Sequence, residues 1–469
     1  MAKETTESQS VATVDASEKE TAKASMFERF FAPASVDTSV SSASDDERSF
    51  DSRSHVSTLS GSSDGSDESS CSSSSSAQRF DRELRAKHRS ACKNMTVGKY
   101  DRAIKAFEAI LADLLDRYGD DHHRVGAALH NVAVANLRAG KLNDARDAIE
   151  EAVRIRENTL GKKHPKVADS MVEHGIILLS MKKYDESLKV FEEALKLRER
   201  EAKLAKSADE IKEAKLKMAK IRHNIGCVNF EVGNLDRAEE AYTAAIAQQK
   251  SAFGTWSTPF MLLTDTTKPG FLTMASTMCN QGYIALEQAR YSDAISIFYE
   301  SLKIQKNLLE ADNKLILSTL DNIGFAYCML QELDKAVQIY SELVKLHKDP
   351  NTDAERRGWA AAIKKLIYCQ IRLYDFENAF DNLRLLEEYL SLKGPRTRSN
   401  VEDIDKTHEL MGEVNYQIFK FPSIAEYTRR AVGSCGICAD DRDAINVDAW
   451  FPKKPANGSK MSGHRMTYA

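Results

Sequence analysis

A pair of small residues, twelve positions apart, recurs along this chain of 469 residues. Each pair spans a break that is polar or contains glycine, such as Ala139-Gly140-Lys141. The second members of successive pairs are 42, 42, 51, 56, 42 and 43 residues apart. The pairs are Ala91/Ala103, Ala133/Ala145, Gly175/Ser187, Gly226/Ala238, Gly282/Ala294, Gly324/Ala336 and, with a large first member, Ile367/Ala379. A period of this length with a break inside it predicts stacked helix–turn–helix units, that is, an all-α solenoid.

The second predicted helix of each repeat carries a large residue four positions after its small one. These residues are Phe107, Ile149, Phe191, Tyr242, Phe298, Tyr340 and Leu383. Residues four apart share a helix face, and small residues let two helices cross closely. One hairpin cannot bury this face alone, so neighbouring hairpins must stack. Repeats are expected at residues 79–118, 122–159, 164–206, 209–251, 271–309, 314–347 and 353–392.

One linker between repeats has a distinctive sequence. Residues 152–157 read AVRIRE, and residues 160–168 read LGKKHPKVA. This stretch resembles the linker of the 42-residue tetratricopeptide repeats of kinesin light chains, and residues 119–122 are a weaker copy. The resemblance implies a right-handed α-solenoid over residues 79–433, with about seven repeats and a degenerate C-terminal cap. It also implies a non-catalytic, kinesin-light-chain-like adaptor that binds a protein or an extended peptide in the concave groove of the repeats.

The region before the repeats departs from that family, which carries a heptad coiled coil there. Residues 1–78 hold 14 acidic and 6 basic side chains, and 18 of the 36 residues from Ser41 to Ser76 are serine. This composition predicts a disordered segment, so a motor subunit is not expected. The aromatic cluster at residues 26–31 is either fortuitous or a docking motif for a partner or for the chain's own groove.

Serines in this segment suggest an alternative mode of action. Ser42 and Ser44 precede Asp45 and Glu47 by three residues, a spacing that acidophilic kinases favour. Phosphates there would add negative charge. The alternative function is a phosphorylation-regulated scaffold, autoinhibited by its acidic N-terminal segment.

The sequence carries no catalytic signature. It has no phosphate-binding loop, no dinucleotide fingerprint and no H-E-x-x-H motif. Cys435 and Cys438 form a CxxC pair within residues 434–469, which are expected to be an irregular tail. Structural zinc needs four ligands, so we predict no enzyme activity, no cofactor and no metal. A metal- or thiol-linked protein acting through this pair is the remaining alternative.

Composition also limits the partners and the location. No run of 18 apolar residues is present, which argues against a membrane span. The formal net charge of −4 argues against nucleic-acid binding. The N-terminus has no apolar signal stretch, so a cytoplasmic location is expected.

The candidate binding site is a row of asparagines on the first predicted helices. The row contains Asn131, Asn224, Asn280 and Asn322, each two residues before the small position. In the family that it resembles, this position contributes to the peptide groove, where an amide can donate to and accept from a peptide backbone. The neighbouring candidates are His130, His223, Tyr283, Phe325 and, in an apolar insertion at residues 253–270, Trp256. The competing interpretation is that the asparagines only stabilise packing between repeats.

The third repeat is expected to form a taller hairpin than the others. Residues 196–222 hold ten basic and five acidic side chains, and Ser207 can cap the following helix. The hairpin is either a solvated protrusion or a basic arm for an acidic partner, including the chain's own N-terminal segment.

Overall fold

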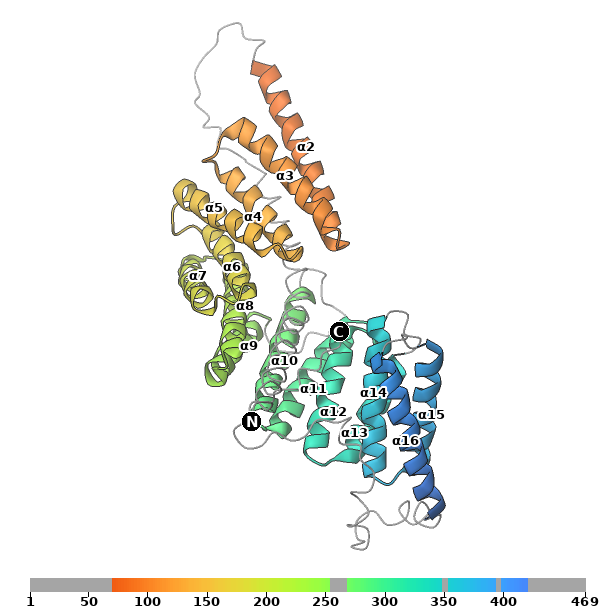
Figure 1. Ribbon diagram of the computed structural model, residues 1–469. Coiled ribbons are helices and arrows are strands. Elements are labelled where there is room, and N and C mark those ends of the chain that lie inside the picture. The colour runs from red at the N-terminus through yellow and green to blue at the C-terminus, as the bar shows by residue number, and fades with distance from the viewer. Residues whose placement is uncertain (1–69, 254–267, 348–352, 394–397, 421–469) are drawn as a thin grey trace, which may run out of the picture. The chain divides into compact units, whose positions relative to one another are not determined.

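The computed structural model describes residues 70–253, 268–347, 353–393 and 398–420, and every regular element within these ranges is an α-helix (Figure 1). The first eight helices are α2 (Ser70–Thr96), α3 (Tyr100–Tyr118), α4 (His123–Arg138), α5 (Leu142–Leu160), α6 (Pro165–Ser180), α7 (Tyr184–Leu204), α8 (Ala208–Val232) and α9 (Leu235–Phe253). The remainder are α10 (Lys268–Glu287), α11 (Tyr291–Leu308), α12 (Lys314–Met329), α13 (Leu333–Leu346), α14 (Asp353–Arg372), α15 (Phe376–Lys393) and α16 (Arg398–Lys420). The helices form two units, one ending at Thr273 and one starting at Met274, and each is described by itself.

The helices pair in sequence order as seven hairpins, from α2 with α3 to α14 with α15, as the repeat pattern predicts. Helix α2 begins at Ser70, so the last nine residues of the segment predicted to be disordered, residues 70–78, are helical instead. These residues are serine-rich, but they continue directly into the amphipathic first helix, which supplies the helical nucleus that a short segment lacks alone. The rest of that segment lies outside the described residues.

The tight turn inside each hairpin uses one left-handed residue, seven positions after the first member of the residue pair, which is small in six hairpins and is Ile367 in the seventh. The φ angles range from 58° to 91° at Gly98, Gly140, Lys182, Gly233, Ala289, Gln331 and Tyr374. The next N–H donates back to the carbonyl five residues earlier, as in Lys141 N to Asn136 O at 2.9 Å. This is the hydrogen bond of a Schellman motif. Four of the seven positions hold a residue with a Cβ atom, which is strained in this conformation.

The small positions form helix crossings, as predicted. The Ser187 hydroxyl donates to the Gly175 carbonyl at 2.7 Å, so the two small residues of that repeat face each other. Aromatic rings from the second helices cover the glycines. A Cβ atom at Gly226 would lie 2.5 Å from the Tyr242 ring, and one at Gly282 would lie 2.7 Å from the Phe298 ring. These glycines are therefore required by ring packing rather than by backbone conformation.

Side chains in the turns between repeats cap the first helices. His122 Nδ1 accepts from Arg124 N at 3.2 Å, and His164 Nδ1 accepts from Lys166 N at 3.1 Å. Asn313 does the same for α12 through Oδ1. Both histidines therefore act as helix caps.

The third and fourth hairpins are longer, because α7 has 21 residues and α8 has 25. Ser207 caps α8 as predicted, accepting from Glu210 N at 3.1 Å. At the C-terminal end, α16 packs on α15 and buries Leu410 and Val414. Helix α16 is the part of the predicted C-terminal cap that the structure describes. Residues 421–469 lie outside the described residues, as does most of the insertion at 253–270.

Candidate peptide-binding surface

The four asparagines of the predicted row lie at equivalent positions of α4, α8, α10 and α12. Asn131 is partly exposed, whereas Asn224, Asn280 and Asn322 are only 5%, 6% and 4% exposed. The row therefore occupies one register of the first helices, and three of its amides lie beneath the surface.

Asn131 contacts the preceding repeat. Its Nδ2 lies 3.3 Å from Nε2 of His88 on α2. His88 is buried and stands edge-on to Phe107, with ring centroids 5.7 Å apart. This contact favours, at Asn131, the interpretation that the asparagine stabilises packing between repeats.

Asn224 has different surroundings. Its Nδ2 is buried and has no hydrogen-bond partner within the described part of the chain. A buried donor without an acceptor costs about 1–3 kcal/mol. Asn224 is thus the member of the row whose amide N–H groups lack an acceptor among the described residues.

The two candidate histidines are buried next to the row. His130 Nδ1 lies 3.3 Å from Ser170 Oγ, which also accepts from Arg156 Nη1 at 2.8 Å. Burial, together with the charge of Lys220, lowers the pKa of His223 to about 4. His223 is therefore neutral at pH 7, so it offers one donor and one acceptor rather than a positive charge.

The aromatic candidates divide into two kinds. Tyr283 is partly exposed and stands perpendicular to Phe298, with ring centroids 6.0 Å apart. Phe325 is 2% exposed and belongs to the hydrophobic core of the C-terminal unit. Trp256 lies outside the described residues.

Two positions where the row departs from asparagine, Glu173 and Lys365, form ion pairs between first helices. Glu173 on α6 lies 3.5 Å from Lys220 on α8. Lys365 on α14 donates to Asp321 on α12 at 2.7 Å, and both side chains are buried. The Cys279 thiol similarly lies 3.4 Å from the Thr319 hydroxyl.

We call these contacts the polar ladder. Its rungs are His88–Asn131, His130–Ser170, Glu173–Lys220, Cys279–Thr319 and Asp321–Lys365. Sequence reasoning identified Asn131 and His130 and missed their partners His88 and Ser170. The available signal was polar residues on consecutive first helices, spaced by about one repeat.

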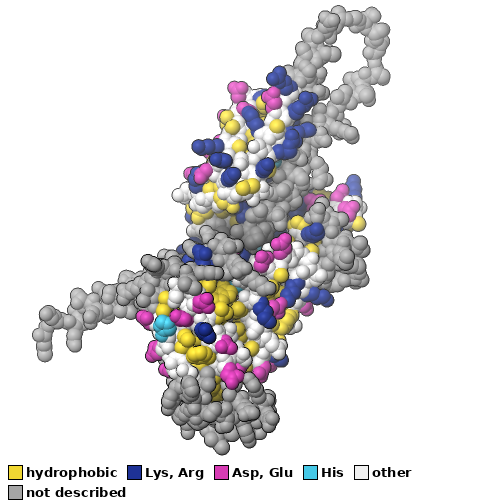
Figure 2. Space-filling view, turned by 90° about the vertical axis from the view of Figure 1, so that its right-hand side faces the viewer, with side chains coloured by type: hydrophobic (Ala, Val, Ile, Leu, Met, Phe, Trp, Pro, Cys, Tyr) yellow, Lys and Arg dark blue, Asp and Glu magenta, His cyan; other side chains and the backbone are white. Residues whose placement is uncertain are grey.

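Charge is unevenly spread over the N-terminal unit. The exposed side of α2 carries Arg82, Arg89 and Lys93, which have no ion pair among the described residues. In Figure 2, dark blue side chains lie along the helices near the top, with fewer magenta ones among them. This stripe makes the first helix of the solenoid cationic.

Metal sites, membrane-spanning helices and the CxxC pair were also considered in the sequence. Among the described residues, no group of three or more His, Cys, Asp or Glu side chains is placed to hold a metal ion. No described helix is both long enough and apolar enough to cross a membrane. The Cys435/Cys438 pair lies outside the described residues.

Comparison with known proteins identifies the repeats. Profiles of the tetratricopeptide repeat match residues 91–158, 125–200, 273–349 and 219–251. No curated protein matches the chain in sequence.

Solved structures with similar chains are distant in sequence. The apo form of RapI is 13% identical, with 73% of this chain and 86% of that chain covered and a TM-score of 0.51. TPR-like repeats assigned to a kinesin light chain of Podosopora anserina are 14% identical, with 50% and 100% covered and a TM-score of 0.38. BtubC (BKLC) from P. vanneervenii is 15% identical, with 57% and 90% covered and a TM-score of 0.39. At these identities the likeness concerns the fold alone.

Proposed function

Because the chain is a tetratricopeptide-repeat protein whose repeats resemble those of kinesin light chains, we propose that it is a non-catalytic scaffold that binds an extended peptide of a partner protein along its first helices. The repeat fold itself implies protein partners. The finer assignments, a groove lined by the asparagine row, a kinesin-light-chain-like adaptor role and a cytoplasmic location, are part of the proposal.

The observation that supports peptide binding most directly is the buried Asn224 amide without an acceptor. The amide nitrogen has no solvent-exposed surface, so neighbouring side chains must move for a peptide carbonyl to reach it and satisfy the donor. Such a hydrogen bond contributes about 1 kcal/mol net. Loss of the Asn224 amide would thus weaken binding roughly fivefold, since 1.4 kcal/mol corresponds to a factor of ten.

The test starts from a displayed peptide library screened against the full chain. The dissociation constants of the selected peptides are then measured for Asn224→Ala. We expect affinity to fall about fivefold, for the reason just given, with the melting temperature nearly unchanged.

The matched control is Asn143→Ala, an exposed asparagine on the second helix α5, which should leave affinity intact. If Asn224→Ala binds every selected peptide as tightly as the unchanged chain does, Asn224 is not part of the binding site. If the variant unfolds, Asn224 is structural.

A further inference from the structure

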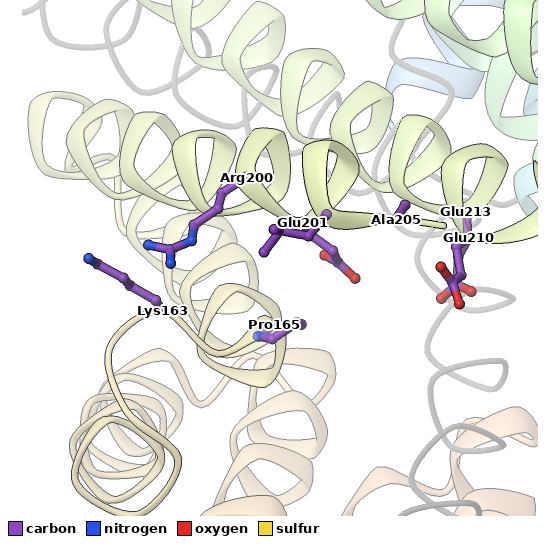
Figure 3. A pocket seen from close by; sticks show the side chains of 8 residues that line it. Lys163, Pro165, Arg200, Glu201, Ala205, Glu210 and Glu213 are labelled. Carbon is purple, nitrogen blue, oxygen red and sulfur yellow. The ribbon is translucent and has the colours of Figure 1, made fainter. Parts of the chain in front are cut away.

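A hollow of about 260 Å³ lies where the turn between α5 and α6 meets the turn between α7 and α8. Pro165, Leu204 and Ala205 supply apolar lining. Figure 3 shows Lys163 and Arg200 at one end of the hollow, and Glu210 and Glu213 at the other. Leu204 is 66% exposed, which is unusual for a large apolar side chain beside such a hollow. The hollow lies at the turns between repeats and not on the asparagine row.

The carboxylates of this hollow already have partners. Glu201 accepts from Arg198, and Glu213 pairs with Lys217 at 2.5 Å. Glu210 accepts from the backbone N–H groups of Lys206 and Ser207. Their negative charge is therefore largely compensated by partners within the protein.

The two cations at the other end, Lys163 and Arg200, are not paired, and neither is Lys203, which does not line the hollow but precedes Leu204 on α7. All three are exposed, and none of them has an ion pair or a side-chain hydrogen bond within the described part of the chain. Arg200 and Lys203 are three residues apart on α7, so they share a face. The hollow thus offers an apolar floor beside free positive charge. The cationic stripe on α2 has no such hollow beside it, so it is the weaker candidate for binding an acidic ligand.

A ligand that fits this surface is an acidic peptide with one large apolar side chain. The chain's own N-terminal segment contains such a stretch, Asp45-Asp46-Glu47-Arg48-Ser49-Phe50-Asp51. Its four carboxylates surround a single aromatic residue. We propose that residues 45–51 dock intramolecularly at this hollow, with Phe50 against Leu204 and Pro165 and the carboxylates against Lys163, Arg200 and Lys203.

The connecting chain is long enough for this contact. Residues 52–69 lie between the acidic stretch and the start of α2. Eighteen extended residues span up to about 60 Å. Adjacent helices pack about 8–10 Å apart, so the five helix steps from α2 to α7 cover about 50 Å at most. Docking within one molecule is therefore sterically feasible.

The test uses the full chain and a reagent that couples carboxylates directly to lysine amines. We expect the carboxylates of residues 45–51 to couple to Lys163 and Lys203. Arg200→Glu should lower these two cross-links about tenfold, because the attraction of one exposed ion pair is replaced by a repulsion of similar size, while both reporting lysines remain. Coupling should also fall in 1 M salt, where the screening length is about 3 Å. Leu204→Ser should weaken it through the loss of the apolar contact.

Lys189→Glu is the matched control, since Lys189 is an exposed cation on the same helix and away from the hollow. It should leave the cross-links unchanged. Mixing isotope-labelled with unlabelled chain distinguishes contacts within one molecule from contacts between two. Cross-links spread evenly over all exposed lysines, or found only between different molecules, would overturn the proposal. So would cross-links to Lys163 and Lys203 that are insensitive to both Arg200→Glu and Leu204→Ser.

Discussion

At the scale of single residues, the same physical demands recur in every hairpin. The left-handed turn position is filled by glycine in three repeats and by Lys182, Ala289, Gln331 or Tyr374 in the other four. A left-handed conformation costs an L-residue about 1–2 kcal/mol, whereas glycine adopts it without that strain. The pattern of hydrogen bonds is the same in all seven turns, so the fold imposes this conformation whatever residue occupies the position.

Exchanging residues at these turns should change stability in opposite directions. We expect Ala289→Gly to raise the free energy of unfolding by about 0.5–1 kcal/mol, because relief of strain exceeds the entropy cost of glycine. Gly140→Ala should lower it by about 1 kcal/mol, since a Cβ atom there meets no neighbour within 4 Å and the loss is purely conformational. Urea denaturation measures both. Equal effects of the same sign would show that the turns carry no strain.

The glycines at the helix crossings act through packing instead. In Gly226→Ala the new methyl group would lie 2.5 Å from the buried Tyr242 ring, below any normal carbon–carbon contact. Overpacking typically costs about 1–3 kcal/mol, so we expect this variant to be destabilised. Gly412→Ala in α16 meets nothing within 4 Å and should gain up to about 1 kcal/mol from helix propensity. Thermal melts compare the two. Stabilisation by Gly226→Ala would contradict the assigned crossing.

At the scale of helices, the sequence predicted which helices are present and in what order, because small-residue pairs and turn residues are local signals. The extra length of α7 and α8 followed from the spacing of 51 residues and from the Ser207 cap. The start of α2 did not follow, since Ser70 to Gln78 has no apolar periodicity of its own. Such a segment is helical only as a continuation of the helix that follows it.

Histidine caps make the starts of α4 and α6 sensitive to pH. Burial, followed by the charge of Arg124, lowers the pKa of His122. Burial lowers the pKa of His164 as well, followed by Lys166 and Arg156, while Asp169 and Glu201 oppose the shift. Each folded-state pKa is thus below the unfolded value of about 6.5. The unfolded chain binds more protons in this range, so stability is full above pH 6.5 and is lost as the pH falls through the folded pKa.

We expect His122→Asn combined with His164→Asn to flatten the decline in melting temperature between pH 7 and pH 5. Asparagine caps helices well and does not titrate, and Asn313 already serves this role in α12. Thermal melts across this range provide the measurement, with the unchanged chain as the control. An equally steep decline in the double variant would show that other groups control the acid response.

At the scale of the whole molecule, stability is expected to be the sum of hairpins and their interfaces. The polar ladder adds specificity to these interfaces, because a buried pair such as Asp321–Lys365 is satisfied in only one register. The row of asparagines could be found from the sequence, since all members share one offset from the small residue. Their burial and their partners could not, because these depend on which side chains the neighbouring first helix presents. Asn131 has a partner on the preceding repeat and so has a packing role, whereas Asn224 lacks an acceptor among the described residues and is the strongest candidate for peptide contact.

The most direct test of the proposed binding mode is an experimental structure of the full chain with a selected peptide bound. The account predicts a peptide carbonyl oxygen about 2.7–3.2 Å from Asn224 Nδ2, the distance of an ordinary N–H···O hydrogen bond. It also predicts that the peptide runs along the first helices. A peptide seated only on second helices, with Asn224 Nδ2 still lacking an acceptor, would contradict the account.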